Sequence, residues 1–207
     1  MVGPRRPAGR LARPCIPVNA LFAAAADIQA FCSARGWKSC VIGGLAVQRW
    51  GEPRQTRDVD LTLFTGMGGE EQFVDPLLAR YTARIPDARR FALERRVLLV
   101  QTSSGIPLDV SLGGLPYEAR ILDRATSFEV DPGVVLVTCS AADLVVLKAF
   151  AGRPQDWLDT EGVIVRQRHL LDRDLVLREL RPLLYLKDDE ESEPRLVRLM
   201  AKHPADR

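Results

Sequence analysis

The stretch that decides the fold, residues 41–63, reads VIGGLAVQRWGEPRQTRDVDLTL. A short apolar run ends in Gly43-Gly44 and leads into a predicted helix. The alternating segment DVDLTLF follows and predicts a strand. Because successive side chains of a strand point to opposite faces, Asp58 and Asp60 are expected to share one face.

This arrangement predicts a place for a nucleotide on a metal ion. Two neighbouring carboxylates repel each other unless a cation lies between them, and ligation by oxygen alone suits Mg²⁺. A glycine pair permits close backbone approach to a ligand, and the first N–H groups of the following helix can bind an anion. Gly43-Gly44 can also be a plain turn between strand and helix. Asp58 and Asp60 can equally be solvent-facing residues of a half-exposed strand.

A third carboxylate lies in the apolar run IPLDVSL, residues 106–112. Asp109 alternates with its apolar neighbours and therefore points away from them. We predict strands over 90–102 and 106–112, joined as a hairpin by Ser-Ser-Gly. If the second strand pairs beside the strand of Asp58 and Asp60, three carboxylates converge. Such a triad can hold two Mg²⁺ ions for an in-line displacement at phosphorus.

The order of these motifs resembles the polymerase-β-type nucleotidyltransferase superfamily. Two further motifs resemble the AbiEii/AbiGii-type toxin nucleotidyltransferases, and the similarity covers roughly residues 35–170. The residues that carry it are Gly43-Gly44, Arg54-x-Thr56-x-Asp58-x-Asp60, Asp109 and the segment ADLVVLKAFAGRPQDWLD, residues 142–159, with Lys148, Arg153 and Asp156. One position departs from the pattern, because many relatives carry Ser where this chain has Gly44.

The resemblance implies a role for each of these residues. Asp58, Asp60 and Asp109 would bind two Mg²⁺ ions, with Mn²⁺ as a substitute, and Asp109 would also accept the proton of the attacking hydroxyl. The catalytic set implied by the resemblance is Asp58, Asp60, Asp109 and Lys148. The nucleotide-binding set is Gly43, Gly44, Arg54, Thr56, Lys148, Arg153 and Asp156.

Several of these positions also have a structural interpretation. Arg54 can be a solvated loop charge, and Thr56 can be an edge residue of the strand. Lys148 lies among aliphatic residues, so it either extends to water or meets a buried anion. Asp156 lies in the first turn of a predicted helix, where a negative charge is favoured by the helix dipole. Trp157 can stack on a base or belong to the core.

Composition is that of a compact soluble enzyme. The chain is 46% hydrophobic and 27% charged, which is enough for an ordinary core. A net charge of +2 gives no global signature of nucleic-acid binding. The arginines between Arg84 and Arg96 could still provide a local basic surface for RNA.

The remaining signals concern location. The four cysteines show no CxxC pair and no metal-ligand spacing, which predicts buried free thiols in a reducing cytoplasm. No apolar run approaches the roughly 20 residues that span a bilayer. The Arg/Pro-rich N-terminus also lacks the apolar core of a secretory signal. We therefore expect a cytoplasmic protein without a membrane segment.

The element order predicts an α/β (α+β) fold, in which a mixed β-sheet core is flanked by helices and followed by a C-terminal helical region. We expect residues 1–16 to be flexible, 17–138 to form the nucleotidyltransferase core and 139–207 to complete the cleft. Other helices are expected over 20–35, 43–50, 70–81, 117–124, 140–151, 155–169, 172–185 and 193–202, and short strands over 40–42, 127–130 and 134–137.

The sequence thus indicates a Mg²⁺-dependent enzyme that transfers a nucleoside monophosphate from an NTP to an acceptor and releases pyrophosphate. The acceptor is left open between tRNA or other RNA, a small molecule and a protein hydroxyl. By resemblance, the protein is a candidate toxin with an antitoxin partner. The alternative is a catalytically inactive nucleotide- or partner-binding module on the same fold. A plain interaction protein that binds an antitoxin is a third hypothesis.

Overall fold

The structure is a computed structural model that describes residues 17–205. The predicted flexible segment, residues 1–16, lies outside the described residues, as do residues 206–207. A seven-stranded mixed sheet runs through the described part of the chain in the order β3-β4-β5-β2-β1-β7-β6. Its strands are β1 (Ser39–Val41), β2 (Val59–Phe64), β3 (Thr82–Ala83), β4 (Val97–Gln101), β5 (Pro107–Gly113), β6 (Thr126–Asp131) and β7 (Val134–Thr138).

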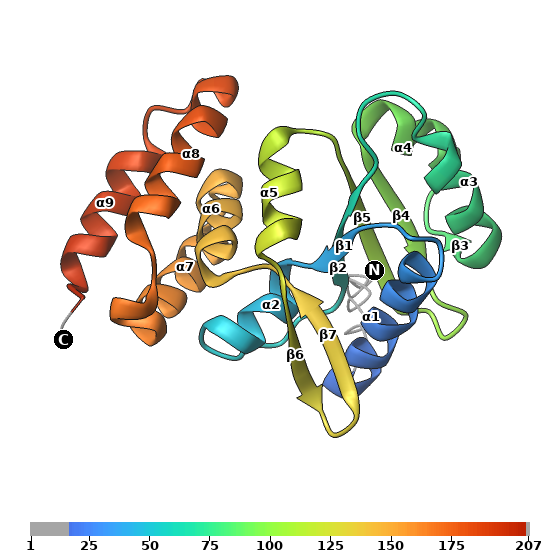
Figure 1. The fold of residues 1–207 in the computed structure, drawn as a ribbon, viewed down its shortest axis with the longest axis horizontal. Coiled ribbons are helices and arrows are strands. Elements are labelled where there is room, and N and C mark those ends of the chain that lie inside the picture. Colours follow the sequence, from blue (N-terminus) through green and yellow to red (C-terminus); the bar gives the residue numbers. More distant parts are fainter. Residues whose placement is uncertain (1–16, 206–207) are drawn as a thin grey trace, which may run out of the picture.

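Helices cover both faces of this sheet (Figure 1). They are α1 (Val18–Ser33), α2 (Gly43–Trp50), α3 (Glu71–Arg80), α4 (Ala88–Arg95), α5 (Pro116–Arg124), α6 (Ala141–Ala151), α7 (Pro154–Gln167), α8 (Arg173–Lys187) and α9 (Ser192–Lys202), with a 3₁₀ turn at Arg168–Leu170. The sequence therefore predicted the fold class and most of the helices, with ends that differ by at most two residues.

The pairing that positions the site is confirmed. β2 and β5 are parallel neighbours, and the register places Asp60 directly beside Asp109. β4 and β5 pair antiparallel as the predicted hairpin, with Gln101 opposite Pro107. A shift of one residue would have turned Asp109 to the opposite face.

The predicted strand over 90–102 is wrong in its first half. Residues 88–95 form α4, and only Val97–Gln101 is strand. The physical reason is a helical pattern: Ala88 and Ala92 are buried four residues apart on one face, Phe91 and Leu93 are partly buried, and the other four residues are charged. Arg96 then ends the helix in the left-handed conformation, with φ of +57°.

Two hydrophobic cores lie on opposite faces of the sheet. Val41 belongs to a core that packs β2, β4 and β5 against α1, α3 and α4. Its neighbour Cys40 points the other way, into a core formed with α2, α5 and α6–α9. This second core crosses the expected boundary at residues 138 and 139, since Val47 and Ile121 belong to it. The division into core and helical region stays a prediction.

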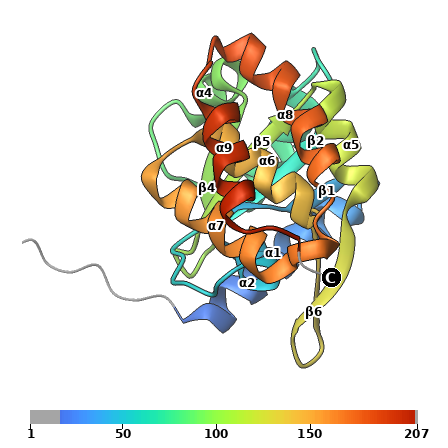
Figure 2. The same ribbon diagram turned by 90° about the vertical axis from the view of Figure 1, so that its left-hand side faces the viewer.

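The C-terminal helices form a layer beside the sheet, with α7, α8 and α9 facing the viewer in Figure 2. Of the helices in residues 17–205, none has the length and apolar character required to cross a membrane. Cys32, Cys40 and Cys139 are buried free thiols, as predicted for them. Burial raises the pKa of the Cys32 thiol to about 11.

Candidate functional site

A pocket of about 620 Å³ opens between the loop before β2, the carboxylate edge of β2 and β5, and the start of α7. This volume is typical of a small-ligand site. The pocket brings together all of the predicted site residues except Gly43. Its lining is Gly44, Arg54, Gln55, Thr56, Arg57, Asp58, Asp60, Asp109, Lys148, Arg153, Pro154, Gln155 and Asp156.

One wall of the pocket is acidic, and we call Asp58, Asp60 and Asp109 the acidic wall. Burial, together with repulsion from Asp58 and Asp109, raises the pKa of Asp60 to about 6. Burial also raises the pKa of Asp109, while Arg84 acts in the opposite direction. The acidic wall therefore holds more negative charge than its surroundings neutralise.

The glycine pair brings a helix start against this wall. Gly43 has φ of +59°, and a Cβ atom there would lie only 1.9 Å from Oδ2 of Asp60. The backbone N–H of Gly44 donates a hydrogen bond to the same carboxylate, which lowers the pKa of Asp60 against the stronger effect of burial. The pair is thus required for close packing of α2 on β2, beyond a plain turn.

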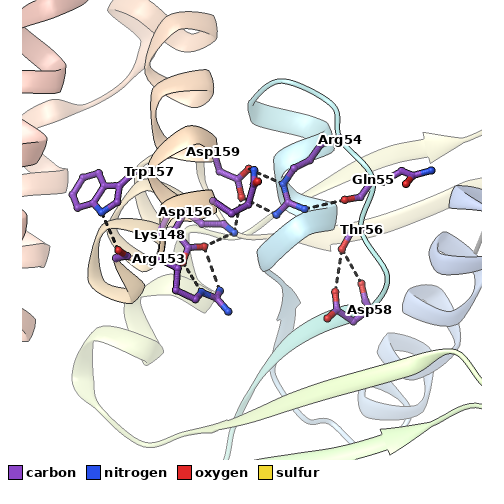
Figure 3. Close-up of polar contacts among 11 residues, drawn as sticks. Arg54, Gln55, Thr56, Asp58, Lys148, Arg153, Asp156, Trp157 and Asp159 are labelled. Carbon is purple, nitrogen blue, oxygen red and sulfur yellow. Dashed lines mark hydrogen bonds and ion pairs between the residues drawn. The ribbon is translucent and has the colours of Figure 1, made fainter. Parts of the chain in front are cut away.

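Gly44 also makes room for a hydroxyl group. A Cβ atom at position 44 would lie 2.4 Å from Oγ1 of Thr56, so a serine does not fit while Thr56 is in place. The Thr56 hydroxyl in turn donates to Oδ1 of Asp58 at 3.0 Å (Figure 3). A hydroxyl group from the neighbouring loop therefore occupies the space beside Gly44.

The opposite wall is basic, and we call Arg54, Lys148 and Arg153, with their partners Asp156 and Asp159, the paired wall. Lys148 is 7% exposed, and its Nζ lies 3.0 Å from Asp156 and 2.8 Å from Asp159. The buried anions that Lys148 contacts are therefore carboxylates of the protein itself.

Arginines complete the paired wall from both sides (Figure 3). Arg54 binds Asp159 through Nε and Nη2, at 2.7 and 2.8 Å. The Nε of Arg153 donates to Asp156 at 2.6 Å. Burial alone would raise the pKa of Asp159, but hydrogen bonds from Arg54, Lys148 and Gln155 outweigh it and bring the pKa to about 2.

Sequence reasoning did not assign two residues beside the pocket to the site: Asp159, which it noted only as a residue of a helix start, and Arg84, which it counted in a possible basic surface. Asp159 follows Asp156 by one helical turn, a spacing that places both on one face of α7 and could have revealed their shared lysine. Arg84 lies 25 residues before Asp109, and its Nη1 donates to Oδ1 of Asp109 at 2.7 Å. No local pattern points to that contact.

The predicted basic surface between Arg84 and Arg96 is largely compensated. Arg89 pairs with Asp75 and Arg90 with Asp87, while Arg96 binds Glu70. Trp157 is 5% exposed and its Nε1 donates to the carbonyl of Gly152, in agreement with its structural interpretation.

The acidic wall suits a hard divalent cation. Its carboxylate oxygens are the ligands that Mg²⁺ prefers, and burial, with repulsion from Asp58 and Asp109, raises the pKa of Asp60. Within residues 17–205, however, no three His, Cys, Asp or Glu side chains already form a metal-binding cluster. Asp109, the third carboxylate of the wall, is paired with Arg84.

No protein-family model and no curated protein matches the sequence. Solved structures do match. An antigenic nucleotidyltransferase-like protein from Paracoccidioides brasiliensis aligns with 91% of this chain and 95% of its own, at 13% identity and a TM-score of 0.50. The solution structure of the antibiotic-resistance factor ANT(2″)-Ia aligns over 82% and 94%, at 17% identity and a TM-score of 0.51. The chain has a nucleotidyltransferase fold.

A crystal structure of ANT(2″)-Ia in complex with adenylyl-2″-tobramycin also aligns, over 89% of this chain and 96% of its own, at 18% identity and a TM-score of 0.40. That score adds nothing to the assignment of the fold. At these identities, a nucleotidyltransferase fold is shared across very different sequences, and function has to be argued from the site.

Proposed function

We propose that the protein is a Mg²⁺-dependent nucleotidyltransferase, which transfers a nucleoside monophosphate from an NTP to an acceptor hydroxyl and releases pyrophosphate. The observation that carries the proposal is the pocket itself. A carboxylate wall and a wall of cationic side chains face each other across a space of about 620 Å³. A triphosphate bound with a metal ion needs both walls, because its phosphates are negative and require cationic side chains, while the metal ion is positive and requires carboxylates.

The acidic wall would hold the metal through Asp58 and Asp60, with Asp109 as the third ligand. When bound there, Mg²⁺ would neutralise charge on the phosphates and on the leaving pyrophosphate. The burial of Asp60 beside two other carboxylates supports this assignment, because a cation there would offset their repulsion.

The paired wall would hold the triphosphate. Lys148 uses two of its three donors on Asp156 and Asp159, which leaves one for a phosphate oxygen. Arg153 has a side chain that is 75% exposed and reaches the pocket, and Arg57 lines it without a partner among the described residues. Asp159 fixes Arg54 and Lys148 in position, so the charges are arranged before the nucleotide arrives.

Transfer would then proceed by in-line displacement. The acceptor oxygen forms a bond to the α-phosphorus, and the bond from that phosphorus to the bridging oxygen of pyrophosphate breaks. Asp109, on the strand beside Asp60, accepts the acceptor's proton. The protein contributes positioning and charge neutralisation, without a covalent intermediate.

The finer assignments belong to the same proposal. The motifs at 54–60 and 142–159 support an AbiEii/AbiGii-type enzyme, with RNA, a small molecule or a protein hydroxyl as the acceptor and an antitoxin as a partner. A second candidate is a nucleotide-binding module without turnover. The observation that favours it is that two carboxylates of the same chain already hold Lys148.

One experiment separates these candidates. The protein is incubated with each α-labelled NTP, Mg²⁺ and either total bacterial tRNA or tobramycin, and labelled product, pyrophosphate and protein-bound nucleotide are measured. Asp60→Asn serves as the inactive variant. Asp123→Asn is its matched control, because Asp123 is exposed and pairs only with Lys38 among the described residues.

Transfer or pyrophosphate release that disappears in Asp60→Asn and persists in Asp123→Asn supports the enzyme. Nucleotide binding without pyrophosphate, at every acceptor tried, supports the binding module. Absence of nucleotide binding by the folded protein contradicts both.

A further inference from the structure

Arg84 holds the third carboxylate from the side opposite Asp60. It directly follows β3, and its backbone N–H donates to the carbonyl of Leu99 at 3.1 Å. Leu99 on β4 is in turn the register partner of Asp109 on β5. The Arg84 side chain therefore extends across β4 to place Nη1 2.7 Å from Oδ1 of Asp109.

This contact conflicts with the role proposed for Asp109. A carboxylate has two oxygens, and the proposed reaction uses one for the metal and one for the acceptor's proton. In the structure, Arg84 already occupies Oδ1. A guanidinium at that oxygen also weakens the carboxylate as a base, since it favours the ionised form. A metal ion and a proton to be accepted therefore compete with Arg84 for the same carboxylate.

The released guanidinium would need another anion. The half-exposed side chains on the same face of β4 and β5 carry no charge: they are Val97, Leu99, Gln101, Pro107 and Ser111. Asp156 and Asp159 are already bound by Arg54, Lys148 and Arg153. Asp58 and Asp60 would hold the metal in the proposed function. Arg84, which contacts the pocket through Asp109, thus has no second anionic partner on β4 and β5.

We propose that Arg84 is a specificity-determining residue that leaves Asp109 when the metal binds and takes an anionic group of the acceptor. The inference rests on the proposed function and narrows its acceptor. The acceptor carries a phosphate or carboxylate close to the hydroxyl that reacts. A polycationic acceptor such as tobramycin would place its ammonium groups against the guanidinium and is disfavoured.

The test measures binding, with inorganic phosphate as the probe. The protein is first titrated by calorimetry with Mg²⁺ and a non-hydrolysable α,β-methylene ATP. Inorganic phosphate is then titrated into the nucleotide-saturated protein. Arg84→Gln is compared with wild type and with Arg95→Gln, a control at an exposed arginine of α4 that has no partner among the described residues.

We expect phosphate to bind wild type and Arg95→Gln alike, and Arg84→Gln about tenfold more weakly, as for the loss of one charge-assisted hydrogen bond. Arg84→Lys should recover part of the affinity because it keeps the charge. The Mg²⁺-bound analogue should bind Arg95→Gln as it binds wild type, and Arg84→Gln at least as tightly, because no guanidinium then competes with the metal for Asp109.

Equal phosphate affinity in wild type and Arg84→Gln, with the analogue bound, would overturn the role of Arg84 and leave the proposed function standing. A folded wild-type protein that does not bind the analogue would overturn the proposed function, and this inference with it. Tobramycin that competes with inorganic phosphate in wild type but not in Arg84→Gln would also contradict the anionic acceptor.

Discussion

The two walls of the pocket differ in how well their charges are matched. On the paired wall, Lys148 and Arg54 meet Asp159, whose pKa falls to about 2. On the acidic wall, Asp60 has two carboxylates as neighbours and a pKa of about 6. The carboxylates of the paired wall all form ion pairs, whereas on the acidic wall, among the described residues, Asp109 alone forms one, with Arg84. The difference indicates which half of the site is built in advance and which is completed by ligands.

The largest effect is expected from breaking the paired wall at its centre. Lys148→Met should lower the free energy of unfolding by about 3 kcal/mol, because it leaves two buried carboxylates with fewer partners. Urea denaturation measures this loss. Lys38→Met, at a lysine whose side chain is 72% exposed, is the control and should change stability by less than about 0.5 kcal/mol.

Adding Asp159→Asn to Lys148→Met should restore part of the stability, since one unmatched charge is removed. Equal effects of Lys148→Met and Lys38→Met would mean that the paired wall contributes nothing to the fold.

On the acidic wall, in contrast, removing a charge should raise the free energy of unfolding. The pKa of Asp60 is raised from 3.8 to about 6, so the folded state binds this proton more tightly than the unfolded state does. The free energy of unfolding should therefore fall as pH rises from about 4 to about 6, by up to about 3 kcal/mol from this residue. Water in the open pocket makes that figure an upper bound.

Urea denaturation of wild type and Asp60→Asn, without divalent ions, tests this. Asp60→Asn should be the more stable protein at pH 7 and no more stable at pH 4. Saturating Mg²⁺ should remove most of the difference at pH 7 by stabilising wild type. A difference that does not change between pH 4 and pH 7 would contradict the charge imbalance on the acidic wall.

The close packing of Gly44 against Thr56, beside the acidic wall, can be tested by substitution. Gly44→Ser should destabilise the fold by about 1–3 kcal/mol, because its Cβ would overlap Thr56, as in overpacked sites. Thr56→Gly in the same chain removes the overlapping atoms and should recover stability. Thermal unfolding of the single and double variants measures this coupling. If the two effects simply add, Gly44 and Thr56 do not share the space.

Local sequence patterns predicted those features of the two walls that depend on a single strand or helix. Alternation in DVDLTLF and IPLDVSL was enough to place Asp60 and Asp109 on one face, and their pairing in β2 and β5 is confirmed. The contact of Arg54 with Asp159 joins residues 105 positions apart, and nothing in either segment encodes it.

Arg84 was missed for a related reason. It depends on β3, a strand of two residues, and on α4, which the sequence analysis assigned to a strand. If residues 90–95 formed a strand, no helix would separate β3 from β4, and nothing would predict that Arg84 lies beside β4. The error in secondary structure therefore also prevented the sequence analysis from predicting the contact between Arg84 and Asp109.

The smallest effect on stability is expected at Arg153, and it separates folding from ligand binding on the paired wall. Its side chain is 75% exposed, so its bond to Asp156 is screened by water, and Arg153→Gln should cost less than about 1 kcal/mol of stability. Its position on the pocket nevertheless predicts about tenfold weaker binding of the Mg²⁺-bound ATP analogue, measured by calorimetry. Arg178→Gln, which lies outside the pocket, provides the comparison. Loss of binding with unchanged stability would mark Arg153 as a residue of the paired wall that contacts the triphosphate, whereas loss of stability with unchanged binding would confine it to supporting Asp156.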